Sequence, residues 1–434
     1  MIPARPFLAA LGVFALLGVL PFWLPAVAQV WQLAISGFLL LALLDTLLIR
    51  NAPLRVQRES RPSMSLDSWS TVVLTLDNTA NRVPLSISLY DHHPEHFLAE
   101  GLPLDLVVPA GKTARAEYRV RPVERGLASF TNCDLRIRSR LGFWWHRRRV
   151  LLPAEVRVYP NYSTISQLLA YEVDSNLQLA GLRLRQRRGE GIEFHQLRDY
   201  RQGDAIRSID WKATARVGRL ITREYQDERD QQVVFLLDTG RRMQAKDANL
   251  SHFDHSLNAM LLLSYIALRH GDAAGVMTMG SERSFLPPRK GADAVNGILN
   301  HVYDIQPERI EVDYISAATD LAVRQRRRSL IVMLTNVREE DTDELLRAVR
   351  LLSQKHLVMI ASLRERALDD TLAAPIRNHT DALTYAATQQ YMDSRRETHQ
   401  LLSASGVHFE DCLSNELPAA ITNRYLAIKR AGLL

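Results

Sequence analysis

The densest group of side chains that could do chemistry lies between residues 188 and 243. Its first half includes the carboxylates of Glu193, Asp199, Asp204 and Asp210. Paired carboxylates can act in general acid–base catalysis when one of them holds its proton near neutral pH. Here arginines and a lysine are equally frequent, and ion pairs with them would lower the carboxylate pKa values. His195 has no nucleophile motif beside it. The stretch therefore predicts no catalytic residue.

Two non-catalytic roles remain for this stretch, in which Tyr200 and Trp211 are the large rings. As a fastening element, it would hold the connector onto the neighbouring domain through arginine–carboxylate forks, with both rings as apolar anchors. As a docking surface, it would present the same residues to a partner. The pattern agrees with either role. The residues expected to carry it are Glu193, Arg198, Tyr200, Gly203, Asp204, Arg207, Asp210, Trp211, Lys212, Arg216 and Arg223.

The local structure of this stretch can be predicted from its periodicity. Residues 192–198 alternate as a strand, and residues 220–225 alternate again. Between them, Asp204 is expected to cap a short helix that carries Ile206, Ile209 and Ala213 on one face. Gly218 is expected to end that helix.

From residue 230 onward, strand and helix patterns alternate. The aliphatic run at 233–237 is typical of a parallel strand that is buried on both faces. Further strands are predicted at 273–279, 330–334, 357–362 and 407–410, and helices at 253–269, 292–303, 315–326, 341–352, 389–404 and 417–431. This order predicts a doubly wound α/β domain, with 284–286 as a short antiparallel edge strand. Ligands of such sheets bind beyond the carboxyl ends of the strands, where Asp238 lies.

The stretch around Trp211 also resembles the signature of the domain of unknown function 58 family, which is found in many bacterial membrane proteins. The matching residues are Gly191, Glu193, Phe194, Leu197, Arg198, Tyr200, Gly203, Asp204, Arg207, Ile209, Asp210, Trp211, Lys212, Ala215, Arg216, Leu220, Arg223 and Glu224. The resemblance implies that residues 230–434 form a von Willebrand factor A-like domain.

Domains of that type often bind a divalent cation through three loops, of the form Asp-x-Ser-x-Ser, a Thr and an Asp. The corresponding positions here are Asp238, Gly240, Arg242, Thr319 and Asn336. A hard cation needs several oxygen ligands, and this set lacks both serine hydroxyls and the third-loop carboxylate. The sequence therefore predicts no bound metal, with a Mg²⁺ site completed by Asp320 as the alternative. Asp238 is expected to pair with an arginine, such as Arg242, or to cap the following turn.

Residues 53–161 show strand periodicity and frequent turns. Alternating runs at 69–76, 85–89, 113–120 and 135–137 predict an immunoglobulin-like β-sandwich. The run Phe143-Trp144-Trp145 is followed by three arginines. We expect its rings to pack into the sandwich, and a membrane or partner contact is the alternative. Cys133 and Cys412 are the only cysteines, so no disulfide framework is predicted.

The first fifty residues predict a membrane anchor. Residues 6–25 and 30–49 are each about as long as a bilayer-spanning helix. Arg5 precedes the first run and arginines follow the second, so both ends are expected in the cytoplasm, at a bacterial inner membrane. Asp45 lies inside the second run and can reach the headgroups, and a functional role for it is the alternative.

The composition and these patterns together lead to a multidomain architecture. It comprises a transmembrane helical hairpin (1–52), the β-sandwich (53–161), the connector with the signature segment (162–229) and the α/β domain (230–434). A net charge of +6 suits a membrane surface, and no nucleic-acid motif accompanies it.

The family resemblance implies a function that the residues alone do not show. Its members are commonly encoded beside MoxR-type AAA+ ATPases and are thought to act with them in assembling or maturing other proteins. We therefore expect a membrane-tethered, non-catalytic adaptor. The alternatives are a metal-dependent or acid–base enzyme of the cell envelope, and a structural scaffold. The client protein and the oligomeric state are left open.

Overall fold

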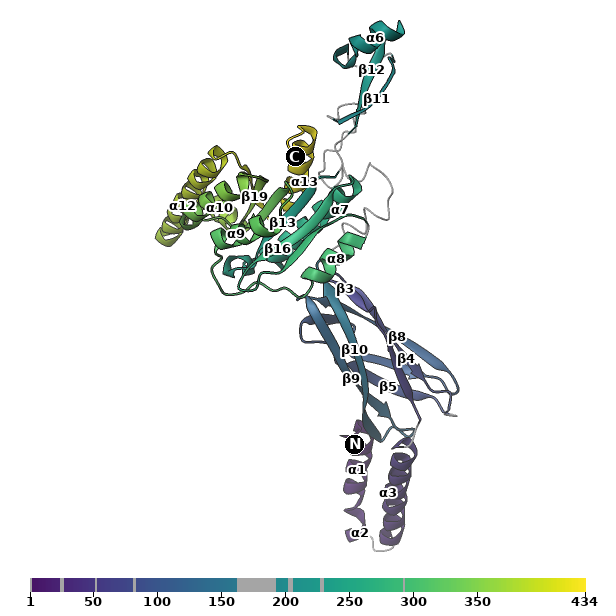
Figure 1. Cartoon of the computed structure of the whole chain (residues 1–434). Coiled ribbons are helices and arrows are strands. Elements are labelled where there is room, and N and C mark those ends of the chain that lie inside the picture. The colour runs from purple at the N-terminus through teal and green to yellow at the C-terminus, as the bar shows by residue number, and fades with distance from the viewer. Residues whose placement is uncertain are drawn as a thin grey trace. The chain divides into compact units, whose positions relative to one another are not determined.

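The structure is a computed structural model that describes residues 2–23, 27–50, 53–80, 83–161, 193–201, 206–226, 230–291 and 293–434. The chain divides into two compact units, Met1–Tyr159 and Pro160–Leu434 (Figure 1). The first contains an apolar helical pair and two β-sheets, and the second contains the signature segment and the α/β domain. In the connector, the sequence pattern favours a helix at 164–184, followed by a basic stretch at 183–188, and both lie outside the described residues.

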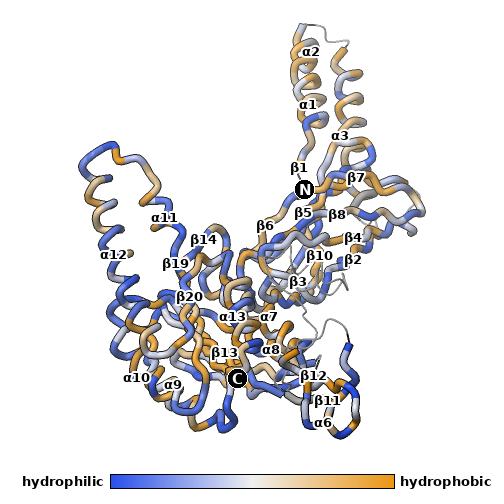
Figure 2. The backbone as a smooth tube through the Cα atoms, turned by 90° about the horizontal axis from the view of Figure 1, so that it is seen from above, coloured by the Kyte–Doolittle hydropathy of each residue, from blue (hydrophilic) through white to orange (hydrophobic). Residues whose placement is uncertain are grey.

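The helical pair has two arms. The first contains α1 (Arg5–Leu17) and the short α2 (Leu20–Trp23), and the second is α3 (Ala28–Arg50). Figure 2 shows both longer helices as mostly hydrophobic. The stretch Ala28–Leu47 is long and apolar enough to cross a membrane. The sequence predicted two such spans, but α1 has 13 residues. Its rise of about 20 Å is shorter than a hydrocarbon core of about 30 Å.

The end of α1 has a structural cause at Gly18, its C-cap. A Cβ atom at Gly18 would lie 3.0 Å from the indole of Trp31, so glycine allows that ring to approach. The Nε1 of Trp31 donates to the carbonyl of Phe14 at 3.1 Å. The same carbonyl also accepts from the backbone N–H of Gly18 at 2.9 Å, so the Trp31 indole is held at the last turn of α1.

The strands of the first unit form two sheets, as the predicted β-sandwich requires. The larger has the order β1-β10-β9-β5-β7, with β3 beside β10, and the smaller has the order β2-β4-β8-β6. The bounds in the larger sheet are β1 Ile2–Pro3, β3 Ser63–Ser65, β5 Leu85–Asp91, β7 Leu104–Val108, β9 Gly126–Arg138 and β10 Trp144–Tyr159. Those in the smaller sheet are β2 Arg55–Glu59, β4 Ser70–Asp77, β6 Phe97–Glu100 and β8 Thr113–Pro122.

The two sheets share a core that contains a buried ion pair. Phe97 and Phe130, one from each sheet, meet edge to face with ring centroids 5.9 Å apart. Arg58 pairs with Asp91, and the hydroxyl of Tyr118 donates to the same carboxylate at 2.6 Å. A buried charge is tolerated when it is paired and hydrogen-bonded in this way.

The aromatic run after the β9–β10 turn does not pack into the sandwich, and that prediction is wrong. Phe143 lies against Phe38 of α3 at 5.4 Å, and Trp144 lies against Phe7 of α1 at 4.6 Å. The indole of Trp144 donates to the carbonyl of Ala42 at 3.0 Å. The β9–β10 turn is therefore fixed to the helical pair, and its rings cover the apolar faces of α1 and α3.

The second unit is built on a sheet with the order β17-β16-β13-β18-β19-β20, in which β17 alone is antiparallel. Its strands are β13 Gln232–Asp238, β16 Ala273–Met279, β17 Phe285–Arg289, β18 Leu330–Thr335, β19 Leu357–Arg364 and β20 His408–Leu413. One face packs on α7 (His252–Arg269), α8 (Asp293–Val302) and α13 (Leu417–Arg430). The other packs on α9 (Tyr314–Arg324), α10 (Thr342–Ser353) and α12 (His379–Ala404). This is the doubly wound arrangement that the sequence predicted.

Two helical features of this domain, α11 (Arg366–Ala373) and the first part of α12, were not predicted from the sequence. The short helix α11 follows β19, and α12 begins ten residues before its predicted start at 389. The early part of α12 is largely exposed and polar, so it lacks the apolar face that periodicity detects. Asn378 caps its start by accepting from the backbone of Asp381 at 2.8 Å.

The signature segment folds as a hairpin of β11 (Glu193–Asp199) and β12 (Ile221–Gln226), with η2 (Ile206–Ser208) and α6 (Trp211–Val217) between them. The helix is capped by Asp210, whose carboxylate accepts from the backbone of Ala213 at 2.9 Å. The predicted cap, Asp204, lies outside the described residues. The helix begins later than predicted, because its cap is Asp210. Gly218 ends it in the left-handed conformation, as predicted.

Candidate functional site at the carboxyl edge of the sheet

Asp238 ends β13 at the carboxyl edge of the sheet and is 2% exposed. Its Oδ1 accepts from the backbone N–H of Gly240 at 2.7 Å, and its Oδ2 accepts from the hydroxyl of Thr335 at 2.5 Å. Of the two sequence-based expectations, the turn cap is the one observed. Burial raises the pKa of Asp238, and the two hydrogen bonds oppose that rise.

Gly240 occupies a position that has no space for a side chain. A Cβ atom there would lie 2.8 Å from the side chain of Val312 and 3.0 Å from the carbonyl oxygen of Ile310. The serine of a cation-binding first loop would therefore force the loops apart. Glycine at this position is a packing requirement of the edge.

The second loop contributes Tyr314, which the sequence analysis did not select. Tyr314 begins α9, is buried, and shares a hydrogen bond of 2.9 Å with the hydroxyl of Thr335. Its own hydroxyl lies 3.5 Å from Oδ2 of Asp238. The carboxylate of Glu344 accepts from its backbone N–H at 2.5 Å. A buried tyrosine hydroxyl needs a partner, and that need could have pointed to it.

Thr319 and Asp320 do not reach the site, which corrects the second-loop prediction. Thr319 is exposed on α9 and donates to the carbonyl of Ile315 at 2.8 Å. Asp320 accepts from Arg324 at 2.6 Å. Both side chains are therefore used within α9, and neither can complete a cation shell around Asp238.

Arg242 binds acidic residues from the third loop and makes no ion pair with Asp238. Its guanidinium pairs with Asp341 and, at 3.0 Å, with Glu340. Both lie on the 3-10 turn η4 (Glu339–Asp341) that follows β18. Arg241 pairs with Glu311 at 2.7 Å beside it. A pocket of about 200 Å³ lies between these loops.

Asn336, at the third-loop position, is buried and belongs to a second network. Its amide donates to Glu365 at 2.8 Å, and its Oδ1 accepts from Arg395 at 3.2 Å. Arg395 comes from α12, is almost fully buried, and also donates to Ser362 at 2.7 Å and Asp411 at 2.8 Å. No local sequence pattern identifies Arg395, because its partners come from distant strands.

These contacts do not fit a divalent cation. Asp238 has both oxygens hydrogen-bonded, Gly240 offers no hydroxyl, and guanidinium groups already neutralise the carboxylates at Asp341 and Asp411. Within the described ranges, no group of three or more His, Cys, Asp or Glu side chains is arranged to hold a metal ion.

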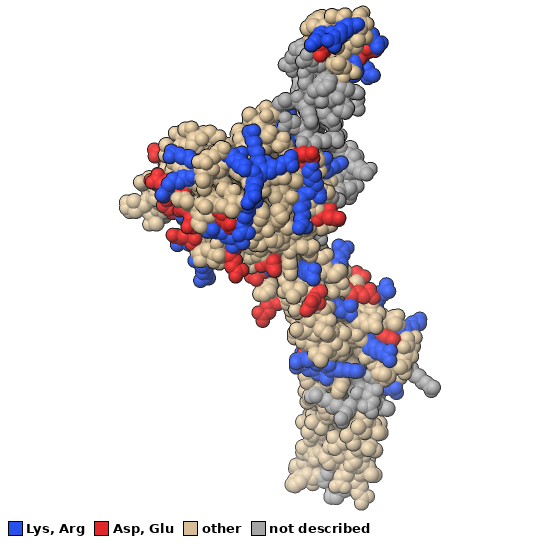
Figure 3. Space-filling model, in the orientation of Figure 1, with Lys and Arg blue, Asp and Glu red and all other residues tan. Residues whose placement is uncertain are grey.

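The signature segment is the second candidate site, and its surface is apolar and basic. Ile209 and Ile221 are 9% and 6% exposed and form its small core. Trp211 is 64% exposed, so it does not anchor the segment to any described residue. Lys212 and Arg216 are exposed beside it. Figure 3 shows basic side chains on the surface of the signature segment.

The other predicted residues of the segment are less fully described. Tyr200 is half-buried, and its backbone N–H donates to the carbonyl of Leu220 at 2.9 Å. Arg198 donates to the carbonyl of Asp199 at 3.1 Å. For Glu193, Arg207 and Arg223 only the backbone is described, and Gly203 and Asp204 lie outside the described residues.

Part of the chain is similar to a known protein family. Residues 196–401 match the family model described as "Protein of unknown function DUF58". The match begins in the signature segment and ends within α12, so it covers residues of both candidate sites.

Two further similarities were found. The chain is 25% identical over 193 residues to "Uncharacterized protein YeaD" of Bacillus subtilis (strain 168), covering 43% of this chain and 44% of that protein. The chain thus spans less than half the length of this curated relative. An aerotolerance-related membrane protein from Bacteroides fragilis NCTC 9343 matches 45% of this chain and 98% of its own, with 14% identity and a TM-score of 0.30.

Proposed function

We propose that the protein is a membrane-tethered, non-catalytic adaptor that docks a partner protein on its signature segment. The partner proposed from the family resemblance is a MoxR-type AAA+ ATPase, engaged during assembly or maturation of other proteins. The observation that carries the proposal is the exposed Trp211 among apolar and basic neighbours. Tryptophan and arginine are the residues most enriched in the energetic centres of protein interfaces.

The exposed side chains of the signature segment indicate which kind of partner surface would bind it. Its exposed apolar side chains are Leu197, Ile206, Trp211, Val217 and Leu220. Lys212 and Arg216 lie among them on α6, and Arg219 follows the helix. Exposed apolar residues rimmed by charge mark interaction sites. The charge complement of this surface is a partner with an apolar pocket and an acidic rim.

The carboxyl edge of the sheet supports binding over catalysis. Asp238 has a raised pKa, which is the property that favours the alternative function, an acid–base enzyme of the cell envelope. Its carboxylate is nevertheless 2% exposed and hydrogen-bonded on both oxygens, so little of it is presented to the pocket that it lines. We propose instead that this edge is a von Willebrand factor A-like platform with fixed arginine–carboxylate pairs.

The proposed setting is the cytoplasmic side of a bacterial inner membrane. The helix α3 supplies the tether, and arginines at both ends of the helical pair favour cytoplasmic termini. Protease added outside intact spheroplasts should leave the sandwich and the α/β domain uncut. Cleavage of the sandwich under those conditions would exclude a cytoplasmic ATPase as the partner.

Co-purification of the full chain from native membranes tests the docking role. Trp211→Ala should lose most of the AAA+ ATPase that the parent retains and should melt at the parent's temperature, because Trp211 is exposed. Leu383→Ala, an exposed leucine on α12, is the matched control and should retain the partner. Asp210→Ala removes the α6 cap at a cost of about 1 kcal/mol and should weaken binding through the fold.

Two outcomes would contradict this proposal. Equal ATPase retention by Trp211→Ala and Leu383→Ala would remove the signature segment as the docking surface. A lower melting temperature for Trp211→Ala, with the partner still bound, would assign the segment a fastening role.

A further inference from the structure

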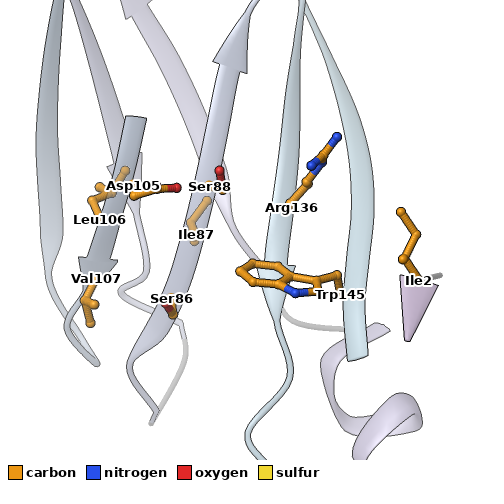
Figure 4. A pocket seen from close by; sticks show the side chains of 9 residues that line it. All are labelled: Ile2, Ser86, Ile87, Ser88, Asp105, Leu106, Val107, Arg136 and Trp145. Carbon is orange, nitrogen blue, oxygen red and sulfur yellow. The ribbon is translucent and has the colours of Figure 1, made fainter. Parts of the chain in front are cut away.

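A groove of about 620 Å³ crosses the outer face of the larger sandwich sheet (Figure 4). Its apolar end is formed by Trp145 of β10 and Ile2 of β1. Its polar end is formed by Asp105 of β7, Ser88 of β5 and Arg136 of β9, and Ser86 lies two residues before Ser88 on β5. The adaptor role uses none of these residues.

The apolar end lies at the level of the membrane anchor. Trp144, next to Trp145, donates its indole N–H to Ala42, which lies inside the apolar stretch of α3. On the other side, Ile2 pairs with Trp145, and α1 begins three residues later at Arg5. Tryptophan rings favour the boundary between hydrocarbon and headgroups. Trp145 and Ile2 therefore mark that boundary on the sheet.

The polar end lies one headgroup layer beyond this boundary. Arg136 is opposite Arg147, two residues after Trp145 along β10. Two residues of a strand span about 7 Å. The headgroup region on each side of a bilayer is roughly 5–8 Å thick. The polar end of the groove, the row formed by Asp105, Ser88 and Arg136, is therefore at the depth of lipid phosphates and the groups attached to them. We call these three residues the polar row.

The polar row presents opposite charges on the two sides of a hydroxyl. Asp105 and Arg136 are each directly opposite Ser88 in the strand register, so their backbones are about 10 Å apart. Figure 4 shows the carboxylate of Asp105 directed toward Ser88, with Arg136 on the other side. Both charged side chains are exposed, and neither forms a hydrogen bond or ion pair with the part of the chain that the structure describes.

We propose that this groove binds the headgroup of a zwitterionic aminophospholipid, of the phosphatidylethanolamine type. The lipid phosphate accepts hydrogen bonds from Arg136 and from the hydroxyls of Ser86 and Ser88, and the lipid ammonium donates to Asp105. The acyl chains leave the groove past Trp145 and Ile2. This inference rests on the proposed membrane attachment and is independent of the adaptor role.

Asp105 is the residue that decides the lipid class. A purely anionic headgroup, such as that of phosphatidylglycerol, would place its charge beside a carboxylate, and like charges repel. The quaternary ammonium of phosphatidylcholine has no N–H group to donate to Asp105. A primary ammonium two carbons from a phosphate satisfies both ends of the row. Charge-assisted hydrogen bonds of this kind are the stronger ones in proteins.

Lipid titration of the full chain in detergent tests the proposal. Dioleoyl phosphatidylethanolamine, phosphatidylglycerol and phosphatidylcholine are added separately, and bound lipid is counted by native mass spectrometry. The parent should bind the ethanolamine lipid at least about tenfold more tightly than the choline lipid, as one hydrogen bond to a charged group predicts. Asp105→Asn should remove that preference, and Arg136→Gln should weaken binding of all three lipids, because Arg136 contacts the phosphate that they share.

Control variants separate a specific site from general effects. Arg115→Gln changes an exposed arginine on β8 of the other sheet and should keep the parent's preference. Arg136→Lys keeps the positive charge and should weaken lipid binding less than Arg136→Gln does. The proposal is overturned if the three lipids bind the parent equally, or if Asp105→Asn behaves like Arg115→Gln. Tightest binding of the glycerol lipid, strengthened further by Asp105→Asn, would show an anionic-lipid site and would also overturn it. None of these results changes ATPase co-purification, so the two proposals fail separately.

Discussion

The guanidinium of Arg242 binds the carboxylate of Asp341, whereas Asp238 accepts its hydrogen bond from the hydroxyl of Thr335. The loops after β13 and β18 are thus joined by an arginine–carboxylate pair and a hydroxyl–carboxylate bond. A cation entering this edge would have to displace one of these protein groups. Fixed charges of this kind hold the two loops together without a metal.

The first prediction concerns metal binding by the full chain in detergent. Titration with Mg²⁺ or Mn²⁺ in a calorimeter should give no saturable heat, because Asp238 alone offers too few hard oxygens to replace the hydration shell of Mg²⁺. The partner should therefore remain bound in EDTA. Saturable binding at micromolar metal that disappears in Asp238→Ala would show a working cation site and would contradict this interpretation.

The second prediction uses the steric environment of Gly240. Gly240→Ala should destabilise the α/β domain by about 1–3 kcal/mol, because the new methyl group overlaps Val312 and the carbonyl of Ile310. Gly297→Ala in α8 is the matched control. Gly297 has open space around its Cβ position, so alanine there should stabilise the helix by about 0.5–1 kcal/mol. Thermal melting of both variants should shift in opposite directions, and equal shifts would show that the crowding at Gly240 is relieved at little cost.

The same edge shows what the sequence could and could not predict. The buried strands were recovered because an unbroken aliphatic run, such as the one ending at Asp238, has few alternatives. Thr319 was chosen by residue type, but the helix places it one turn beyond Tyr314, on the exposed side. Arg395 was missed because its partners Ser362 and Asp411 lie on two other strands. Contacts between distant segments leave no mark on local periodicity.

The differences near the membrane between prediction and structure have a similar physical origin. Hydropathy alone treats residues 6–25 as one apolar run, whereas the structure has two helices there, α1 and α2, with Gly18 close to Trp31 between them. The rings of Phe143 and Trp144 satisfy strand periodicity, yet the apolar partners they meet are on α1 and α3. In both cases the deciding contact joins two segments that the pattern treats separately.

The third prediction concerns acid stability and His399, whose ring packs at a tilt against Phe409 with the ring centroids 4.3 Å apart. Burial lowers the pKa of His399 to about 4 from its ordinary 6.5. The unfolded chain therefore takes up a proton near pH 6.5, and the folded chain does so only near pH 4. Stability from this group is present above pH 6.5 and is lost as the pH falls toward 4, by up to about 3 kcal/mol.

Melting of the full chain between pH 7 and pH 4 checks this linkage. His399→Phe keeps the ring stacking and removes the titration, so its melting temperature should fall less steeply with acid than the parent's. His96→Gln changes a histidine whose side chain is 58% exposed, and it should follow the parent. Parallel curves for the parent and His399→Phe would show that His399 carries no part of the acid dependence.

The last prediction concerns Asp45, whose Oδ1 accepts from the backbone N–H of Leu141 at 3.1 Å. Asp45 is 2% exposed on α3, and Leu141 lies in the β9–β10 turn. The carboxylate thus holds this turn against the helix, beside the bond from Trp144 to Ala42. Asp45→Ala leaves the amide of Leu141 without its partner, at a cost of about 1–3 kcal/mol. Asp45→Asn keeps an oxygen acceptor at the same position.

Hydrogen exchange of the turn in detergent should therefore be about tenfold or more faster in Asp45→Ala and close to the parent's in Asp45→Asn. If both variants exchange at the parent's rate, Asp45 has no fastening role, and its place inside the apolar stretch needs a functional explanation. If both exchange equally fast, the negative charge itself, and not the acceptor oxygen, holds the turn.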